Sequence, residues 1–271
     1  MMKDISIGRF VQGNSVLHRL DPRVKIVLST MYMIVIFMLS SPAGLLSAFL
    51  VTVFLAVLSS IPVRKILDSV RPIVFMLFFI FVLNALTIGT GNPLIQVWLI
   101  KITDKGILTA GLMSLRLLLL IVTTSLLLTL TTTPLLMADS LESLFGPLKK
   151  VKMPVHEMAM MMSIALRFIP TLVEETDKIM KAQSSRGAEY DTGNVFVRAK
   201  GYVSVLVPLF VSAFKRAEDL ATAMDARCYR GGEGRTKLKI LRMKRSDFIW
   251  LFSLSGVAAG LICIDLFLKI S

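Results

Sequence analysis

The sequence predicts an all-α, polytopic membrane protein with about five transmembrane helices and a long helical cytoplasmic stretch before the last of them. Two observations lead to this fold class. Hydrophobic residues make up 55% of the 271 positions, above the roughly 45–50% of soluble domains, and the mean hydropathy is +0.73. These residues also gather in long uncharged blocks, and such blocks of about 20 residues predict helices that cross a bilayer.

Residues 1–132 form the predicted N-terminal membrane part with four spans, and residues 248–271 form a final transmembrane helix. No charged residue occurs between positions 26 and 63. That stretch is too long for one span of about 20 residues, and Pro42 near its middle marks a turn. Flanking basic side chains such as Lys25 are expected to reach the inner edge of the bilayer. The expected spans are about 24–41, 43–60, 73–89, 106–132 and 248–268.

Two connections and one charge complete the membrane part. Residues 61–72 are expected to form a short basic loop between spans. The apolar run 94–100 is too short to cross and is expected to lie at the outer interface, where Trp98 would be favoured. Arg116 stands inside the fourth span, so it either reaches outward or pairs locally, or it is a buried charge with a structural or functional role.

Residues 133–247 are charged and helix-patterned, and they form the predicted cytoplasmic domain. A short amphipathic helix is expected at about 135–145, followed by two long helices that end near positions 187 and 229. The apolar run 202–214 within the second long helix is too short to span a bilayer. We expect it to lie buried against other helices or against the membrane part.

Basic residues indicate how the chain is oriented. They gather in the N-terminal segment, in residues 61–72 and in residues 133–247, and such loops usually face the cytoplasm. We therefore expect a multi-pass cell-membrane protein with the N-terminus and the long charged domain inside and the C-terminus outside. The formal net charge of +13 fits an anionic lipid leaflet better than nucleic acid, because most of the basic residues flank apolar blocks.

Catalytic and metal-binding patterns are missing from the sequence. The glycine-rich run 231–236 lacks the lysine and the spacing of a phosphate-binding loop. Cys228 and Cys263 imply neither a disulfide framework nor a metal site, and His156 beside Glu157 is expected to be a polar-face pair. The sequence therefore predicts that the chain is not an enzyme and binds no cofactor itself.

Each long cytoplasmic helix is expected to end in an arginine flanked by small residues. A basic residue in a last helical turn can simply complement the helix dipole, worth about 0.3–1 kcal/mol. Two matched ends in one domain favour docking, because small neighbours let a guanidinium enter a groove and bind a carboxylate with two hydrogen bonds. The predicted docking residues are Ser185, Arg186, Gly187, Ala226, Arg227 and Cys228, with Tyr229, Arg230 and Gly231 as a supporting segment.

Over nearly its whole length the sequence resembles the transmembrane T component (EcfT) of energy-coupling factor (ECF) transporters, of the type shared among several substrate-binding S components. The segments that carry the resemblance are 7–10, 13–15, 18–25, 166–170, 182–188 and, most specifically, 224–236.

This resemblance implies a function and a set of partners. Arg186 and Arg227 would each occupy a groove in one of two ATP-binding ABC ATPase subunits, the A components. Residues 133–247 would be a coupling domain that transmits ATP-driven motion to an S component for vitamin uptake, with ATP bound only by the partner subunits. Three alternatives stay open: a pore-forming permease subunit of another ABC-type transporter, a T component dedicated to cobalt or nickel, and a membrane-anchored scaffold.

Overall fold

The structure is a computed structural model, and it describes residues 10–88, 93–97, 100–147, 153–188, 190, 194–231 and 243–270. The chain divides into two compact units, which are described separately. The bundle unit comprises Gly8–Met137 and Ile240–Ser271, and the hairpin unit comprises Met1–Ile7 and Ala138–Lys239. The division into membrane part and coupling domain stays a prediction, because compactness alone does not show which part lies in a bilayer.

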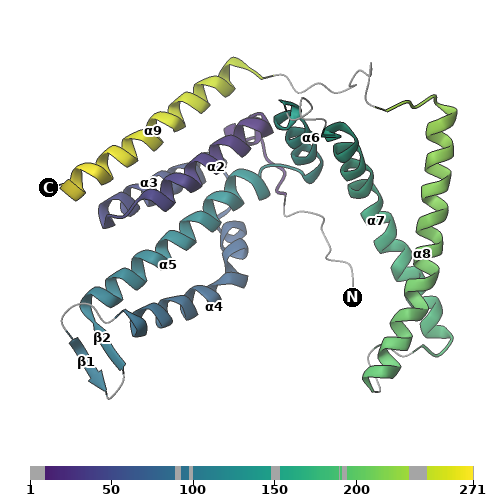
Figure 1. The fold of residues 1–271 in the computed structure, drawn as a ribbon, viewed down its shortest axis with the longest axis horizontal. Coiled ribbons are helices and arrows are strands. Elements are labelled where there is room, and N and C mark those ends of the chain that lie inside the picture. Colours follow the sequence, from purple (N-terminus) through teal and green to yellow (C-terminus); the bar gives the residue numbers. More distant parts are fainter. Residues whose placement is uncertain are drawn as a thin grey trace. The chain divides into compact units, whose positions relative to one another are not determined.

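The described part of the bundle unit contains five long helices and a short one (Figure 1). Prolines start two of them, at the positions where a missing N–H is harmless. The side chain of Asp21 accepts a hydrogen bond from Arg23 N at the start of one, and Ser41 accepts one from Gly44 N at the start of the next. The elements are α1 (Val16–Arg19), α2 (Pro22–Met38), α3 (Pro42–Ser59), α4 (Val63–Thr87), α5 (Asp104–Thr124) with its π-helical continuation η1 (Ser125–Thr129), and α9 (Arg245–Ile270).

The predicted fold class is confirmed, with five described helices long and apolar enough to cross a membrane. They differ in one member from the five predicted spans. Helix α2 has only 17 residues, whereas α8 (Val195–Ala226) qualifies by length and composition. The expectation that the run 202–214 is too short to span was therefore wrong as an argument from length, because the helix extends beyond that run on both sides.

The prediction of a loop at residues 61–72 was also wrong, because most of these residues are helical. Helix α4 begins at Val63, with Pro62 as its N-cap residue, so Arg64 and Lys65 stand on its first turn. Pro72 lies inside the helix, which membrane helices tolerate because neighbouring groups can satisfy the freed backbone carbonyl.

A short antiparallel hairpin follows α4 and was not predicted. Its strands are β1 (Pro93–Val97) and β2 (Ile100–Thr103), with Gln96 opposite Lys101. Trp98 lies outside the described residues, so its place at the outer interface stays a prediction. Thr103 at the end of β2 accepts a hydrogen bond from Gly106 N and donates one to Ile88 O, so it links the starting turn of α5 to the end of α4.

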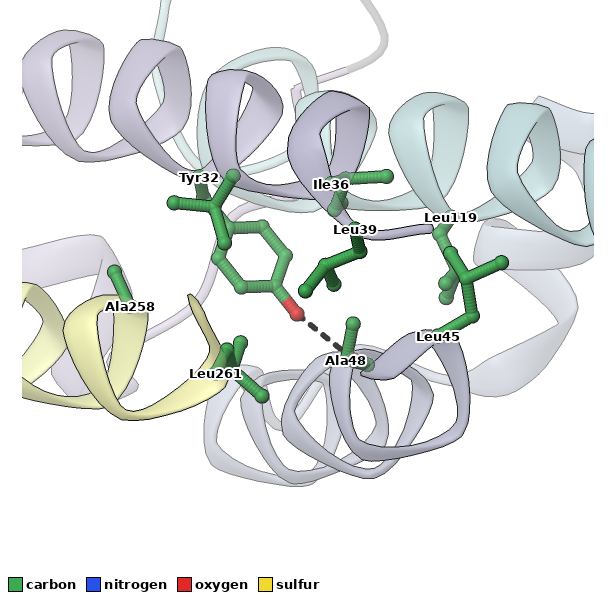
Figure 2. Packing of buried hydrophobic residues seen from close by; sticks show 9 residues of the cluster. Tyr32, Ile36, Leu39, Leu45, Ala48, Leu119, Ala258 and Leu261 are labelled. Carbon is green, nitrogen blue, oxygen red and sulfur yellow. Dashed lines mark hydrogen bonds between the residues drawn. The ribbon is translucent and has the colours of Figure 1, made fainter. Parts of the chain in front are cut away.

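The core of the bundle unit lies where α2, α3, α5 and α9 meet (Figure 2). Tyr32 is fully buried there, and its hydroxyl donates a hydrogen bond of 2.8 Å to Ala48 O on α3. Ala48 and Ala258 present small side chains to the same cluster, which lets helix backbones approach closely where lipid offers no hydrophobic driving force.

Lys25 does not extend outward from the helices, as a side chain that reaches for the bilayer edge would; it is buried. Its side chain is 1% exposed, and Nζ donates to Thr131 O at 2.9 Å and to the hydroxyls of Thr131 and Thr132 at 3.3 and 3.2 Å. The prediction was wrong because the residues after η1 supply carbonyl and hydroxyl oxygens within reach, and a cation is favourable at a helix C-terminus. Lys25 thus ties α2 to the end of the α5–η1 helix.

Arg116 is half-buried, and its Nη2 donates to Leu39 O at the end of α2, a partner 77 positions away along the chain. Asp265, 6% exposed, accepts hydrogen bonds from the backbone N–H groups of Ser40 and Ser41 and from the Ser41 hydroxyl. The Arg116 guanidinium therefore binds the carbonyl just before the α2–α3 turn, while the Asp265 carboxylate binds the N–H groups of the turn itself.

The described residues of the remainder contain three α-helices: α6 (Pro134–Leu144), α7 (Val155–Ser185) and α8 (Val195–Ala226). Helix α6 begins just ahead of the hairpin unit, and α7 and α8 pack on each other within it. Pro170 lies inside α7 and Pro208 inside α8. His156 bonds Glu142 on α6 through Nδ1 at 3.0 Å, so the expected pairing with Glu157 was wrong.

Candidate functional site

The predicted first docking tip is the C-terminus of α7, where Arg186 is the C-cap residue. Gly187 follows with φ of +85°, a left-handed conformation that glycine adopts without steric strain. Two backbone hydrogen bonds close this end, from Gly187 N to Ser184 O and from Ala188 N to Gln183 O, both at 3.0 Å. Together they form a Schellman motif, a common way to terminate a helix.

The second tip, at the C-terminus of α8, repeats this geometry. Arg227 is the C-cap residue, with φ of −92° against −93° at Arg186. Cys228 N donates to Asp225 O at 2.9 Å and Tyr229 N to Met224 O at 3.1 Å. Cys228 occupies the glycine position with φ of +56°. The two arginines are thus presented by the same backbone motif, although only the first has the glycine that favours it.

Both arginine side chains are open to binding. Arg186, Gly187, Arg227 and Cys228 are all exposed. Neither guanidinium has an ion pair with any carboxylate in the part of the chain that the structure describes. A guanidinium held on a fixed helix end in this way can bind an external carboxylate with two parallel hydrogen bonds.

The tips lie at opposite ends of the α7–α8 pair. Helix α7 ends beside the beginning of α8, whose own C-terminus lies at the far end of the pair (Figure 1). The 32 residues of α8 correspond to roughly 48 Å of helix at 1.5 Å per residue. This separation suits two distinct partner surfaces better than one groove.

The supporting segment follows the second tip directly. Arg230 is exposed and Tyr229 is half-buried. Gly231 has φ of +88°, so the chain turns again at once. The rest of the glycine-rich run, residues 232–236, lies outside the described residues.

A polar contact that sequence reasoning missed joins the two long helices. Glu175 on α7 accepts a hydrogen bond from the Ser212 hydroxyl on α8 and pairs with Arg216 Nη2 at 2.9 Å. The hydrogen bond from Ser212, helped by the charge of Arg216, holds the pKa of the Glu175 carboxyl below its ordinary range. Ser212 and Arg216 are four residues apart and therefore share one helix face, which is the signal that could have revealed them.

The left-handed conformation of Cys228 leads to a prediction about the stability of the end of α8. Replacing it with glycine should stabilise the end of α8 by about 1 kcal/mol, because a non-glycine residue in the left-handed region carries a penalty of that size. The mirror change, Gly187→Ala, should destabilise the end of α7 by a similar amount. Hydrogen exchange at Tyr229 N and Ala188 N checks this, with slower exchange in C228G and faster exchange in G187A. Unchanged protection in both variants would contradict the two-tip geometry.

Apolar side chains are exposed on the same unit. Along α8 the exposed positions Val203, Val207, Phe210, Val211 and Phe214 recur at the three- and four-residue spacing of one helix face. A cavity of about 280 Å³ between α6 and α7 is lined almost entirely by apolar groups, among them Phe145, Met158 and Met162. Such faces fit other membrane components better than water.

Among the described residues, no group of three or more histidine, cysteine, aspartate or glutamate side chains is placed to hold a metal ion. Cys228 and Cys263 are free thiols.

Comparison with known proteins gives consistent matches. The model of the family described as CbiQ, cobalt transport protein, matches residues 13–238. A relative from Ruminiclostridium cellulolyticum is 53% identical over 92% of each chain. Relatives from Thermosediminibacter oceani and Bacillus subtilis are 47% and 45% identical, each over 96% of this chain and 97% of the relative. All three are called energy-coupling factor transporter transmembrane protein EcfT.

Proposed function

Since the chain belongs to the EcfT family of energy-coupling factor transporter transmembrane proteins, we propose that it couples two ATPase subunits to a substrate-binding S component. It is a membrane subunit of a transporter. In the proposed mechanism Arg186 and Arg227 each dock into one ABC ATPase, and the helices behind them carry ATP-driven motion to the S component during vitamin uptake.

The observation that carries this proposal is the repeated tip. Two exposed arginines, neither of them ion-paired within the described residues, stand on the same Schellman geometry at opposite ends of one helix pair. A guanidinium suits a groove with a buried carboxylate, because it delivers two hydrogen bonds in a fixed plane. Two tips a helix length apart match two ATPases that change their separation when they bind and hydrolyse ATP.

A force applied to one tip can be transmitted from α7 to α8 within the hairpin unit, because side chains link the two helices. The Glu175–Arg216 ion pair and the Ser212 hydrogen bond cross-link α7 and α8 between the tips, so displacement of one helix end is resisted by the other helix. The exposed apolar face of α8 is the proposed contact for the S component, because an apolar stripe of this length favours a membrane partner.

The proposal assigns no catalysis and no cofactor to this chain, and ATP is bound by the partner subunits. The identity of the imported compound belongs to the S component. A second candidate is a T component dedicated to a metal, favoured by the description of the matching family as a cobalt transport protein. Uptake of radiolabelled Co²⁺ against vitamin uptake, measured with the partner subunits present, separates the two.

Site-specific photo-cross-linking tests the docking. Benzoylphenylalanine placed at Ser185 or at Ala226, next to the arginines, is expected to cross-link to the ATPases in the assembled complex, each position to a different subunit copy. The matched control positions are Glu174 on α7 and Lys215 on α8, both exposed and about 18 Å before the arginines at 1.5 Å per residue. Cross-links from the controls as strong as those from the tips, or none from the tips, would contradict docking at the helix ends.

A further inference from the structure

A cavity of about 300 Å³ in the bundle unit lies between α1 and the first turns of α9. The proposed coupling function makes no use of it. Three kinds of group share its wall: a basic side chain, small polar groups and an indole ring. The lining residues with polar or aromatic groups are Asn14, Arg19, Ser246, Asp247 and Trp250.

The Arg19 guanidinium is available to bind a ligand in this cavity. Its side chain is exposed, and none of the described carboxylates lies within 4.0 Å of it. Asp247 lines the same cavity but is already engaged, with Oδ1 accepting from Asp21 N at 3.3 Å and Oδ2 from Lys244 N at 2.7 Å. The guanidinium is therefore left to bind an anion from outside the chain.

The position of the cavity along α9 indicates its depth in a bilayer. The segment Arg245–Phe267 is long and apolar enough to span, and Trp250 stands within its first two turns. Tryptophan prefers the boundary between headgroups and acyl chains. Val16 and Leu20 line the cavity beside the indole ring. The cavity therefore has a cationic end at Arg19 and an apolar end at Trp250, at the depth of the lipid headgroups.

The surrounding charge favours an anionic ligand. The basic residues on the segments around the cavity outnumber the acidic ones, and both acidic side chains are buried, at 7% and 2% exposure. The basic residues are Arg19, Arg23, Lys244 and Arg245, and the acidic ones are Asp21 and Asp247. Basic segments of this kind usually face the cytoplasmic leaflet, which is the leaflet that carries anionic lipids.

We infer that this cavity binds the phosphate of an anionic glycerophospholipid from the leaflet at the N-terminal ends of α2 and α9. The Arg19 guanidinium donates to the phosphate oxygens, with the Ser246 hydroxyl and the Asn14 amide as further donors. Trp250 and Leu20 contact the glycerol and the first acyl carbons. The inference is independent of how the arginine tips dock.

Trp250 makes the site measurable, because the chain has only two tryptophans and W98F leaves Trp250 as the only indole. The full-length W98F protein is reconstituted in bilayers in which brominated phosphatidylglycerol replaces phosphatidylcholine stepwise. Quenching of Trp250 is expected to show a relative binding constant of about five or more in favour of phosphatidylglycerol. Equal quenching by brominated phosphatidylglycerol and brominated phosphatidylcholine in this protein would overturn the inference without any further variant.

Variants then test the residues, all in the W98F background. R19M should lower the preference for phosphatidylglycerol about fivefold, the contribution of one basic residue near an anionic surface. The control R64M removes an exposed arginine from α4 and should leave the preference unchanged. An equal loss in both variants would mean that general surface charge attracts the lipid, and the inference would be wrong.

Two further arms complete the test. S246A, a smaller change that serves if R19M fails to fold, should lower the preference about two- to fivefold through the lost hydrogen bond. Inorganic phosphate, added at constant ionic strength, should not relieve quenching by the brominated lipid. Relief of quenching would identify free phosphate as the ligand and would overturn the assignment to lipid.

Discussion

Reversing both tip charges, R186E with R227E, is expected to abolish co-purification of the ATPases and to reduce substrate uptake to background. Truncating one partner of a buried, hydrogen-bonded charge pair at an interface typically costs 2–5 kcal/mol. Reversal of the charge adds repulsion from the carboxylate expected in the groove. Because the two tips lie at opposite ends of the α7–α8 pair, losses at the two sites should combine.

The matched control for this experiment is K181E with K215E. Lys181 and Lys215 are exposed on α7 and α8, and their reversal changes the formal charge of the hairpin unit by the same amount. Co-purification and uptake should persist in the control. R186K alone should weaken binding without abolishing it, because lysine keeps the charge but lacks the planar fork. Normal uptake by the double arginine variant would refute docking through these residues.

The substitution G106A is expected to destabilise the bundle unit by about 3 kcal/mol, the upper part of the range for overpacking. A Cβ at this position would lie 2.5 Å from Ile88 O and 2.8 Å from the Thr103 hydroxyl. Ile88 O is backbone at the end of α4, so relief of the clash requires the α4 and α5 ends to separate. That separation would also weaken the Thr103 hydrogen bonds that join β2 to both helices.

The same helix supplies the control. At Gly111, also on α5, an added Cβ would have no described atom within 4 Å beyond its chain neighbours and the backbone of its own helix turn. G111A should therefore gain up to about 1 kcal/mol of stability from the better helix propensity of alanine. Thermal unfolding of the purified full-length protein in detergent measures both variants. If the two unfold at the same temperature, the close approach of α4 and α5 at Gly106 is wrong.

The sequence predicts well those features that depend on local chemistry. Length and hydropathy indicate membrane helices because each must satisfy its own backbone groups. Pro42 marks the turn between the first two predicted spans, and α3 begins there. The arginine–glycine end at Gly187 marks the end of α7, since glycine relieves the strain of a left-handed residue. At the end of α8 the sequence indicates a matching arginine, but Cys228 gives no sign of a left-handed residue, and only the backbone geometry shows that it adopts one.

Other features depend on which segments meet, and no local pattern contains that information. The sequence around Lys25 is typical of a lysine at the membrane interface. The fold instead places the oxygens of Thr131 and Thr132, more than one hundred positions away, within hydrogen-bond distance of its ammonium group. The pairing of His156 with Glu142 instead of Glu157 is decided in the same way, because the fold brings the start of α7 within hydrogen-bond distance of α6.

The sequence by itself determined that this is a helical membrane protein of the EcfT type with two arginine-ended helices. The length of the apolar segments, the residues that end helices and the family motifs are all local properties of the sequence. Only the tertiary structure decided that the two arginines share one terminal geometry at opposite ends of a helix pair, that Glu175 links that pair to Arg216, and that Arg19 and Trp250 share a cavity. The physical reason is that hydrogen bonds and ion pairs act over about 3 Å in space, whatever the separation of their partners along the chain.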